Sequence, residues 1–188
     1  MFYHPVRNLR VVVHGDDFTI LGMEEDLRRF RCQIQSRYEC KLRGMLGPGD
    51  DDEKSIRILN RVITWNHAGI TYEADQRHAE IIVKSMGLRE QVRSVTTPYE
   101  SKLLPEEGEP LGRAEARLYR GLAARGNYLS QDRSDIQYAV KEISRTMANP
   151  CSSDWGRLKR LARYLHDRTR CVSEYKYVER DSPHVAVL

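Results

Sequence analysis

Long hydrophobic runs are missing from this sequence of 188 residues. The longest purely aliphatic stretch is Val11-Val12-Val13, whereas a membrane-spanning helix needs about 20 apolar residues. The N-terminus also lacks the basic and then apolar pattern that is typical of a secretory signal peptide. We therefore expect neither a membrane-spanning segment nor a membrane partner.

Cysteine is scarce, and the spacings of the four residues fit neither a zinc-binding pattern nor a dense disulfide framework. We interpret them as free thiols of a reducing compartment. The sequence also contains no glycine-rich phosphate-binding loop and no Gly-X-Ser-X-Gly nucleophile motif. The function classes that depend on these motifs are therefore excluded. The cysteines are Cys32, Cys40, Cys151 and Cys171.

Charge is unevenly distributed along the chain. The net charge is +4, but residues 111–170 carry 13 Lys and Arg against 6 Asp and Glu, a local excess of +7. The other residues carry 18 against 21, a local charge of −3. A basic second half indicates a polyanionic partner. A solvated helical surface is the alternative, and charge alone does not choose between the two.

Patterning predicts an α+β fold. Hydrophobic alternation with turn formers predicts a hairpin over residues 9–22, one strand over 56–65 and another over 70–73. Helices are expected to begin at Glu24 and Asp75. Residues 97–112 contain three of the seven prolines and are predicted to form a linker. Helical periodicity follows up to about residue 166, and a last strand is expected over 173–178.

Adjacent carboxylates lie at the tip of the first predicted hairpin. Asp16 and Asp17 follow Gly15, and two carboxylates held side by side repel each other unless a divalent cation neutralises them. In phosphoryl-transfer enzymes such a pair holds Mg²⁺. The alternative is an ordinary hydrophilic turn, because Gly-Asp-Asp is also favourable turn chemistry.

The last predicted helix is strongly basic on one face. Such a face can follow a phosphate backbone, with Tyr164 among the cationic residues, or it can simply be solvated. The residues that we expect to contact nucleic acid are Arg157, Lys159, Arg160 and Arg163, and Arg168 and Arg170 continue the face.

An ordered series of motifs resembles a known family. The hairpin around Gly15-Asp16-Asp17 looks like the Tyr-X-Asp-Asp catalytic hairpin of a polymerase palm. The stretch Arg57 to Ile63 falls where that family has its Phe-Leu-Gly-Ile primer-grip strand. Further on, Tyr119-Arg120-Gly121-Leu122 and the run from Arg133 to Val140 are similar to Tyr-Arg-Ser-Leu and Arg-Pro-Asp-Ile-Ala-Tyr-Ala-Val. The family is the reverse transcriptase of Ty1/copia-type retrotransposon Pol polyproteins.

The resemblance implies a partial polymerase palm of antiparallel β-hairpins with helices, followed by a helical thumb or connection. Residues 1–96 would be the C-terminal part of the palm, 97–112 a linker, 113–170 the thumb or connection, and 171–188 the truncated start of a following domain. The fingers, the palm strand with the first catalytic aspartate and the ribonuclease H part would belong to the same polyprotein, outside this chain.

The resemblance also implies a site. Asp16 and Asp17 would be catalytic and would bind Mg²⁺ or Mn²⁺, while His14 and Gly15, which replace Tyr-Val of the family, would neighbour the nucleotide and the primer end. The implied partners are an RNA or DNA template–primer and a dNTP, in the cytoplasm, the nucleus or a retroelement particle. The implied primer-grip residues are Ile58, Leu59, Asn60 and Arg61, with Asn60 in place of the glycine of the family.

Three hypotheses follow from these observations. The first is a fragment of an RNA-directed DNA polymerase, which is expected to be inactive alone because one carboxylate is missing. The second is a non-catalytic nucleic-acid-binding remnant of a decayed retroelement. The third is a purely structural part of a larger polyprotein.

Overall fold

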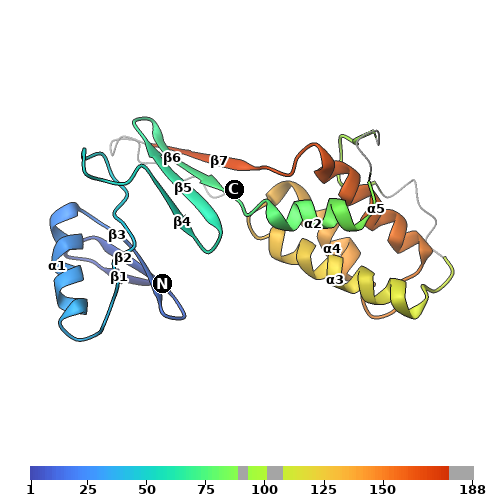
Figure 1. Ribbon diagram of the computed structural model, residues 1–188, viewed down its shortest axis with the longest axis horizontal. Coiled ribbons are helices and arrows are strands. Elements are labelled where there is room, and N and C mark those ends of the chain that lie inside the picture. The colour runs from blue at the N-terminus through green and yellow to red at the C-terminus, as the bar shows by residue number, and fades with distance from the viewer. Residues whose placement is uncertain (89–92, 101–107, 178–188) are drawn as a thin grey trace. The chain divides into compact units, whose positions relative to one another are not determined.

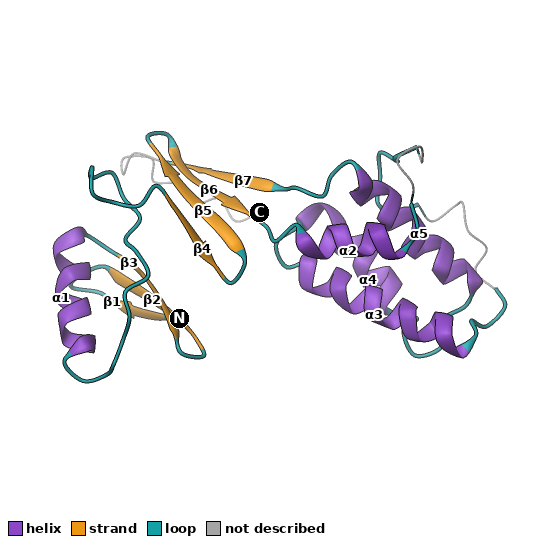
Figure 2. Cartoon of the chain, viewed as in Figure 1, coloured by secondary structure: helices purple, strands orange, loops and turns teal. Residues whose placement is uncertain are grey.

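The computed structural model describes residues 1–88, 93–100 and 108–177. Over these residues the chain is α+β, with two antiparallel sheets and five α-helices (Figures 1 and 2). It divides into two compact units, Met1–Gly44 and Met45–Leu188. No helix in the described part of the chain is long and apolar enough to cross a membrane.

The first unit is a three-stranded sheet with one helix. Strands β1 (Phe2–His4), β2 (Leu9–His14) and β3 (Asp17–Leu21) are antiparallel and lie in the order β1-β2-β3. The sequence predicted β2 and β3 but not β1. Helix α1 (Glu24–Gln35) begins, as predicted, with acidic residues at the positive end of its dipole.

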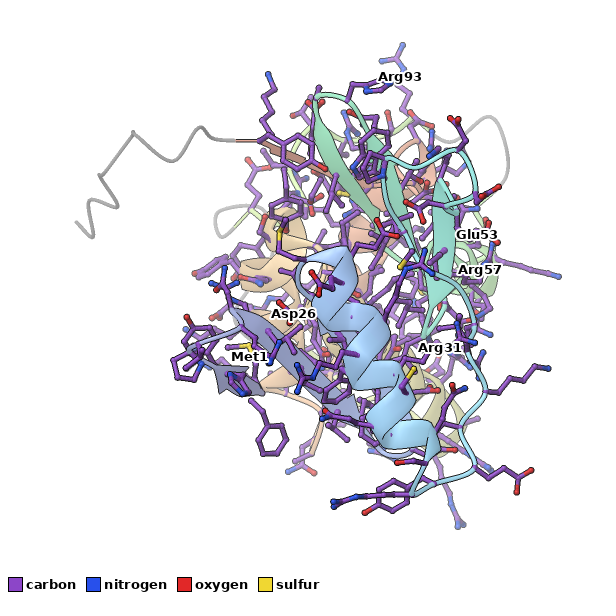
Figure 3. The ribbon with its side chains drawn as sticks, turned by 90° about the vertical axis from the view of Figure 1, so that its left-hand side faces the viewer. Met1, Asp26, Arg31, Glu53, Arg57 and Arg93 are labelled. Atoms are coloured by element: carbon purple, nitrogen blue, oxygen red, sulfur yellow. The ribbon has the colours of Figure 1, made fainter. Side chains whose placement is uncertain are left out.

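Few side chains of this unit are buried. Leu9 and Val11 alternate on one face of β2 and are the buried apolar residues of the unit. Helix α1 buries none of its residues fully, and its expected stripe with Leu27, Phe30 and Ile34 is partly covered, as is Asp26. An ion pair reinforces the packing, since Arg7 donates a hydrogen bond of 2.6 Å to Asp26 of α1. Figure 3 labels Asp26 on this helix.

The second unit contains a four-stranded antiparallel sheet in the order β4-β5-β6-β7. Its strands are β4 (Ser55–Ile58), β5 (Arg61–Asn66), β6 (Gly69–Glu73) and β7 (Val172–Lys176). The β5–β6 hairpin agrees with the prediction. Strand β7, about a hundred residues later in the chain, lies beside β6, with Ile70 opposite Tyr175 (Figure 1). Residues 172–176 thus complete this sheet, which differs from the expected start of a following domain.

One predicted strand is wrong. Residues 56–65 were expected to form a single strand, but the chain reverses at Leu59 and Asn60, whose φ angles are 48° and 65°. Two successive residues in the left-handed region make a two-residue hairpin turn, and asparagine tolerates this region better than most residues. The apolar alternation continues on both sides of Leu59 and Asn60, so the alternation by itself does not indicate the turn.

The helices form the apolar core of the second unit. Helices α2 (Arg77–Ser85), α3 (Arg113–Leu129), α4 (Gln137–Ser144) and α5 (Ser152–His166) share one buried cluster, and the 3-10 helix η1 (Ser134–Ile136) precedes α4. Ala79 and Ile82 of α2 belong to this cluster. Helix α2 therefore packs with the later helices, because its apolar stripe finds its partners there.

The structure thus divides the chain differently from the predicted segments. The boundary between units follows Gly44, within the predicted segment 1–96, and α2 lies with the helices expected only from residue 113. Of the predicted linker 97–112, residues 101–107 lie outside the described residues. The residues that follow contact the start of α5, where the N–H of Ser152 donates a hydrogen bond to the carbonyl of Glu109.

A buried ionic network connects the start of η1 to helix α5 and the residues just after it. Arg133 is 2% exposed and donates two hydrogen bonds, of 2.9 and 2.7 Å, to the carboxylate of Asp135. Its third donor reaches the carbonyl of Arg168, and Tyr164 O–H donates to Asp135 at 3.0 Å. Burial alone would raise the pKa of Asp135, but the hydrogen bonds from Arg133 and Tyr164 lower it on balance.

Candidate metal and nucleic-acid site

The β2–β3 hairpin presents the two adjacent carboxylates at its tip. His14, the last residue of β2, pairs with Asp17, the first residue of β3, which leaves Gly15 and Asp16 as the turn. Gly15 has a φ of 62°, and a Cβ built on it would meet no atom within 4 Å. Backbone conformation, not crowding, therefore favours glycine here.

Both carboxylates are accessible. Asp16 is exposed and Asp17 is partly exposed, with its Oδ1 3.7 Å from Nη2 of the exposed side chain of Arg43. Hard carboxylate oxygens are the ligands that Mg²⁺ prefers. Within the described ranges, no group of three or more His, Cys, Asp or Glu side chains could hold a metal ion. The hairpin thus presents two carboxylates, which by themselves make no complete metal site among the described residues.

His14 lies on the face of the sheet opposite to Leu9 and Val11. It is exposed, and it shares this face with Arg10 and Val12 because side chains alternate along a strand. The structure therefore places His14, Gly15, Asp16 and Asp17 together at one accessible hairpin end, as the sequence predicted. Their roles toward a nucleotide or primer remain predictions.

The residues expected to grip a primer lie around the β4–β5 turn. Ile58 ends β4, Leu59 and Asn60 form the exposed turn, and Arg61 begins β5. Arg57 of β4 is exposed as well (Figure 3). Arg61 differs from the others because its side chain is only 16% exposed and donates to Asp132 at 2.8 Å. Its guanidinium is thus already occupied within the chain.

The predicted basic face of α5 is largely engaged in contacts within the unit. Arg157 donates to Asp154 at 2.6 Å, and Arg163 donates to the carbonyl of Arg93 at 3.0 Å. Arg160 contacts Glu100 at 2.8 Å and is 17% exposed. Lys159 is exposed and has no ion pair among the described residues. The four residues share one helix, but they do not form one free cationic face.

Two further members of that expected face have structural partners. Arg168 contacts the carbonyl of Val95, and Arg170 forms a two-bond ion pair with Glu73. Tyr164, expected among the cationic residues on the surface, is 8% exposed and donates to Asp135. Its side chain is therefore buried and does not lie among exposed cationic residues.

A cationic stripe that sequence reasoning missed lies on α3. Arg113, Arg117 and Arg120 are all exposed and follow each other at spacings of four and three residues, so they lie on one face of the helix. None of them forms an ion pair within the described part of the chain. The excess of positive charge over residues 111–170 was the available sequence signal for this stripe.

A shallow polar cavity of about 300 Å³ lies between the second sheet and the start of η1. Among the described residues that line it, Asp132 alone is charged, and both oxygens of that carboxylate accept hydrogen bonds, from Arg61 and from Tyr72. The cavity therefore offers hydroxyl and amide groups but no unpaired charge. The remaining lining residues are Gln131, Ser134, Gln137, Ser173 and Tyr175.

Comparison with known proteins gives one partial similarity. A stretch of 47 residues, 25% of this chain, is 43% identical to the "Retrovirus-related Pol polyprotein from transposon RE2" of Arabidopsis thaliana. The matched stretch covers 3% of that relative's length. No family model matches the sequence, and no solved structure matches it either. Part of the chain is thus similar to a transposon Pol polyprotein, in agreement with a retroelement-derived fragment.

Proposed function

We propose that this chain is part of a Ty1/copia-type reverse transcriptase, an RNA-directed DNA polymerase encoded in a retrotransposon Pol polyprotein. The observation that carries the proposal is the exposed Asp16-Asp17 pair at the tip of an antiparallel hairpin. The partial similarity to a transposon Pol polyprotein supports the same assignment. Residues 1–96 would then belong to the palm and residues 113–170 to the thumb or connection.

Asp16 and Asp17 would hold Mg²⁺ or Mn²⁺ in the intact enzyme. The donor set fits such an ion because it consists of hard, accessible oxygens. A bound ion would neutralise the phosphate charge of a dNTP and activate the attacking primer hydroxyl. Nucleotide phosphates, water or another part of the polyprotein would fill the other ligand positions. The chain alone is therefore expected to lack polymerase activity.

Nucleic-acid phosphates would contact cationic side chains that are free in the structure. Arg113, Arg117 and Arg120 on α3 are the best placed, with Lys159 on α5 and Arg57 on β4 as further contacts. Arg157, Arg160 and Arg163 would first have to leave their present partners. The β4–β5 turn, with Ile58, Leu59 and Asn60, would approach the primer, and His14 and Gly15 would neighbour its end. Such a protein would work inside the cell, in the cytoplasm, the nucleus or a retroelement particle.

The test is binding of a fluorescent primer–template duplex, measured by anisotropy with and without Mg²⁺. We expect Mg²⁺ to strengthen binding by the unmodified chain, and the Asp16→Asn/Asp17→Asn double variant to lose this gain, because it no longer offers ionised ligands. The matched control is Asp50→Asn/Asp51→Asn, which removes the same charge from another exposed adjacent pair. This control should keep the response to Mg²⁺.

An equal response of all three proteins would contradict the metal-binding proposal. Purely salt-dependent binding would then support the second candidate function, a non-catalytic nucleic-acid-binding remnant. The observation that favours this candidate is the exposed arginine stripe on α3, which needs no metal to bind phosphates. It predicts that Arg117→Gln weakens duplex binding. The slope of the logarithm of the binding constant against the logarithm of the salt concentration should also fall by about 1, as expected for the loss of one phosphate contact.

A further inference from the structure

A polar cluster connects the second sheet to the residues just after α3. Arg61 Nε donates to Asp132 Oδ2 at 2.8 Å, and Tyr72 O–H donates to Asp132 Oδ1 at 2.8 Å. The side chains of Arg61 and Asp132 are 16% and 10% exposed. The two contacts bridge 71 and 60 residues of sequence, so they are tertiary contacts and not local turn chemistry.

Aromatic packing encloses the cluster on the helical side. The guanidinium of Arg61 lies 5.5 Å from the ring centroid of Tyr128 on α3. That ring in turn lies 4.6 Å from the ring of His78 on α2. Burial, followed by the hydrogen bond to Asp132, raises the pKa of Tyr72 to about 12, so its hydroxyl remains a donor at neutral pH. Both oxygens of the Asp132 carboxylate therefore have hydrogen-bond donors, and the side chains of Arg61 and Asp132 are largely buried.

Within the described residues, the β4–β5 hairpin has few other contacts that fix its turn. Strand β4 is the edge of the described sheet and pairs there with β5 alone. Leu59 and Asn60 in the turn are exposed. Arg61 is the first residue after the turn, so the Arg61–Asp132 pair restrains the hairpin at the point where it reverses.

We infer that Asp132 is a positioning residue that, through Arg61, holds the β4–β5 turn against the end of α3. The restraint itself follows from the contacts alone. Its consequence, that the turn is oriented toward a primer, rests on the proposed function. Tyr72 supports the restraint by saturating the second oxygen of Asp132, which fixes the carboxylate in the orientation that Arg61 needs.

Amide hydrogen exchange of the full chain tests the restraint without any nucleic acid. Asp132→Asn should speed exchange of the β4–β5 amides by about tenfold or more, because a charge-assisted hydrogen bond is lost. Arg61→Gln should do the same, and the double variant should add nothing, since both changes remove one interaction. Tyr72→Phe, which keeps the ion pair, should show a smaller effect in the same amides.

Controls separate positioning from general stability. Glu174→Gln removes one exposed carboxylate from β7 and should leave the hairpin amides unchanged. Asp132→Glu keeps a carboxylate and should restore much of the protection. Unchanged exchange in the hairpin, additive effects of the two single variants, or equal acceleration throughout α3–α5 would each overturn the inference.

Duplex binding then tests whether the restrained turn is oriented toward a primer. The direction in which Asp132→Asn changes the affinity separates two roles of Asp132, positioning of the turn and masking of the Arg61 charge. Asp132→Asn removes a negative charge, which by itself strengthens binding to a polyanion. If the turn must be held in place, Asp132→Asn binds the primer–template duplex more weakly than Glu174→Gln, although both variants carry the same charge. Tighter binding than the control would show that Asp132 masks Arg61 and would overturn the positioning role. Loss of metal-dependent binding would not affect the exchange result.

Discussion

At the residue scale, the ionic groups of the second unit serve mainly to hold the fold. Arg133 is among the most deeply buried side chains, and its charge is balanced by Asp135 and by the carbonyl of Arg168. A buried charge is tolerated only when it is paired and hydrogen-bonded. Removal of one partner is therefore expected to cost more than the net contribution of the pair.

Asp135→Asn should destabilise the second unit by about 3 kcal/mol, since the guanidinium of Arg133 would stay buried without its counter-charge. Urea unfolding followed by tryptophan fluorescence measures the change, because Trp65 and Trp155 both lie in this unit. Asp51→Asn, an exposed aspartate, serves as the control and should change stability by less than about 0.5 kcal/mol. Equal effects of the two variants would contradict the structural role of the pair.

The same pair predicts a pH dependence in acid. The folded-state pKa of Asp135 is lowered, so the unfolded chain binds its proton first as the pH falls. Its contribution to stability is fully present above the ordinary aspartate pKa of about 3.9 and is lost as the pH falls through the lower folded value. Unfolding free energies measured over this range should fall less steeply with pH in Asp135→Asn than in the unmodified chain.

At the scale of the element, glycines have opposite roles in α3 and in the second sheet. Gly121 is an exposed residue in the middle of α3, and a Cβ there would meet nothing within 4 Å. Gly69 is the first residue of β6, and a Cβ there would overlap the carbonyl oxygen of Tyr175 in β7. The first position tolerates a side chain, whereas the second requires that none be present.

Gly121→Ala should stabilise the second unit by about 0.5–1 kcal/mol, because alanine loses less backbone entropy in a helix. Gly69→Ala should instead destabilise it and speed amide exchange in β7, since the strand must move away from β6. Thermal unfolding gives the sign of both changes, and hydrogen exchange locates the second. Two changes of the same sign would show that the close approach of β7 to Gly69 is not what selects the glycine.

At the scale of the whole molecule, the two compact units differ strongly in how much they bury. The unit Met1–Gly44 has only Leu9 and Val11 as buried apolar residues, whereas the second unit has a contiguous helical core. Chains of about 40 residues without disulfides or metal rarely form a stable core alone. The first unit carries the carboxylate pair, so the candidate metal site lies on the less stable part.

Unfolding should therefore not be a single transition. Far-UV circular dichroism reports both units, while fluorescence of Trp65 and Trp155 reports only the second. We expect the dichroism signal to begin to change at lower urea concentration than the fluorescence, because the first unit loses its structure earlier. Coincident curves from the two probes would contradict independent unfolding of the units.

The sequence by itself determined most local elements, though not β1 or the β4–β5 turn, and it determined the hairpin tip with Asp16 and Asp17. Period-two and period-3.6 patterns, turn formers and acidic helix starts act over a few residues, so they can be read without the fold. Only the tertiary structure decided which charges are free. Arg157, Arg160 and Arg163 on α5 found partners within the unit, Arg61 found Asp132 across 71 residues, and the arginines of α3 stayed exposed. Long-range pairing decides the availability of a charge, because it depends on which surfaces the apolar core brings together.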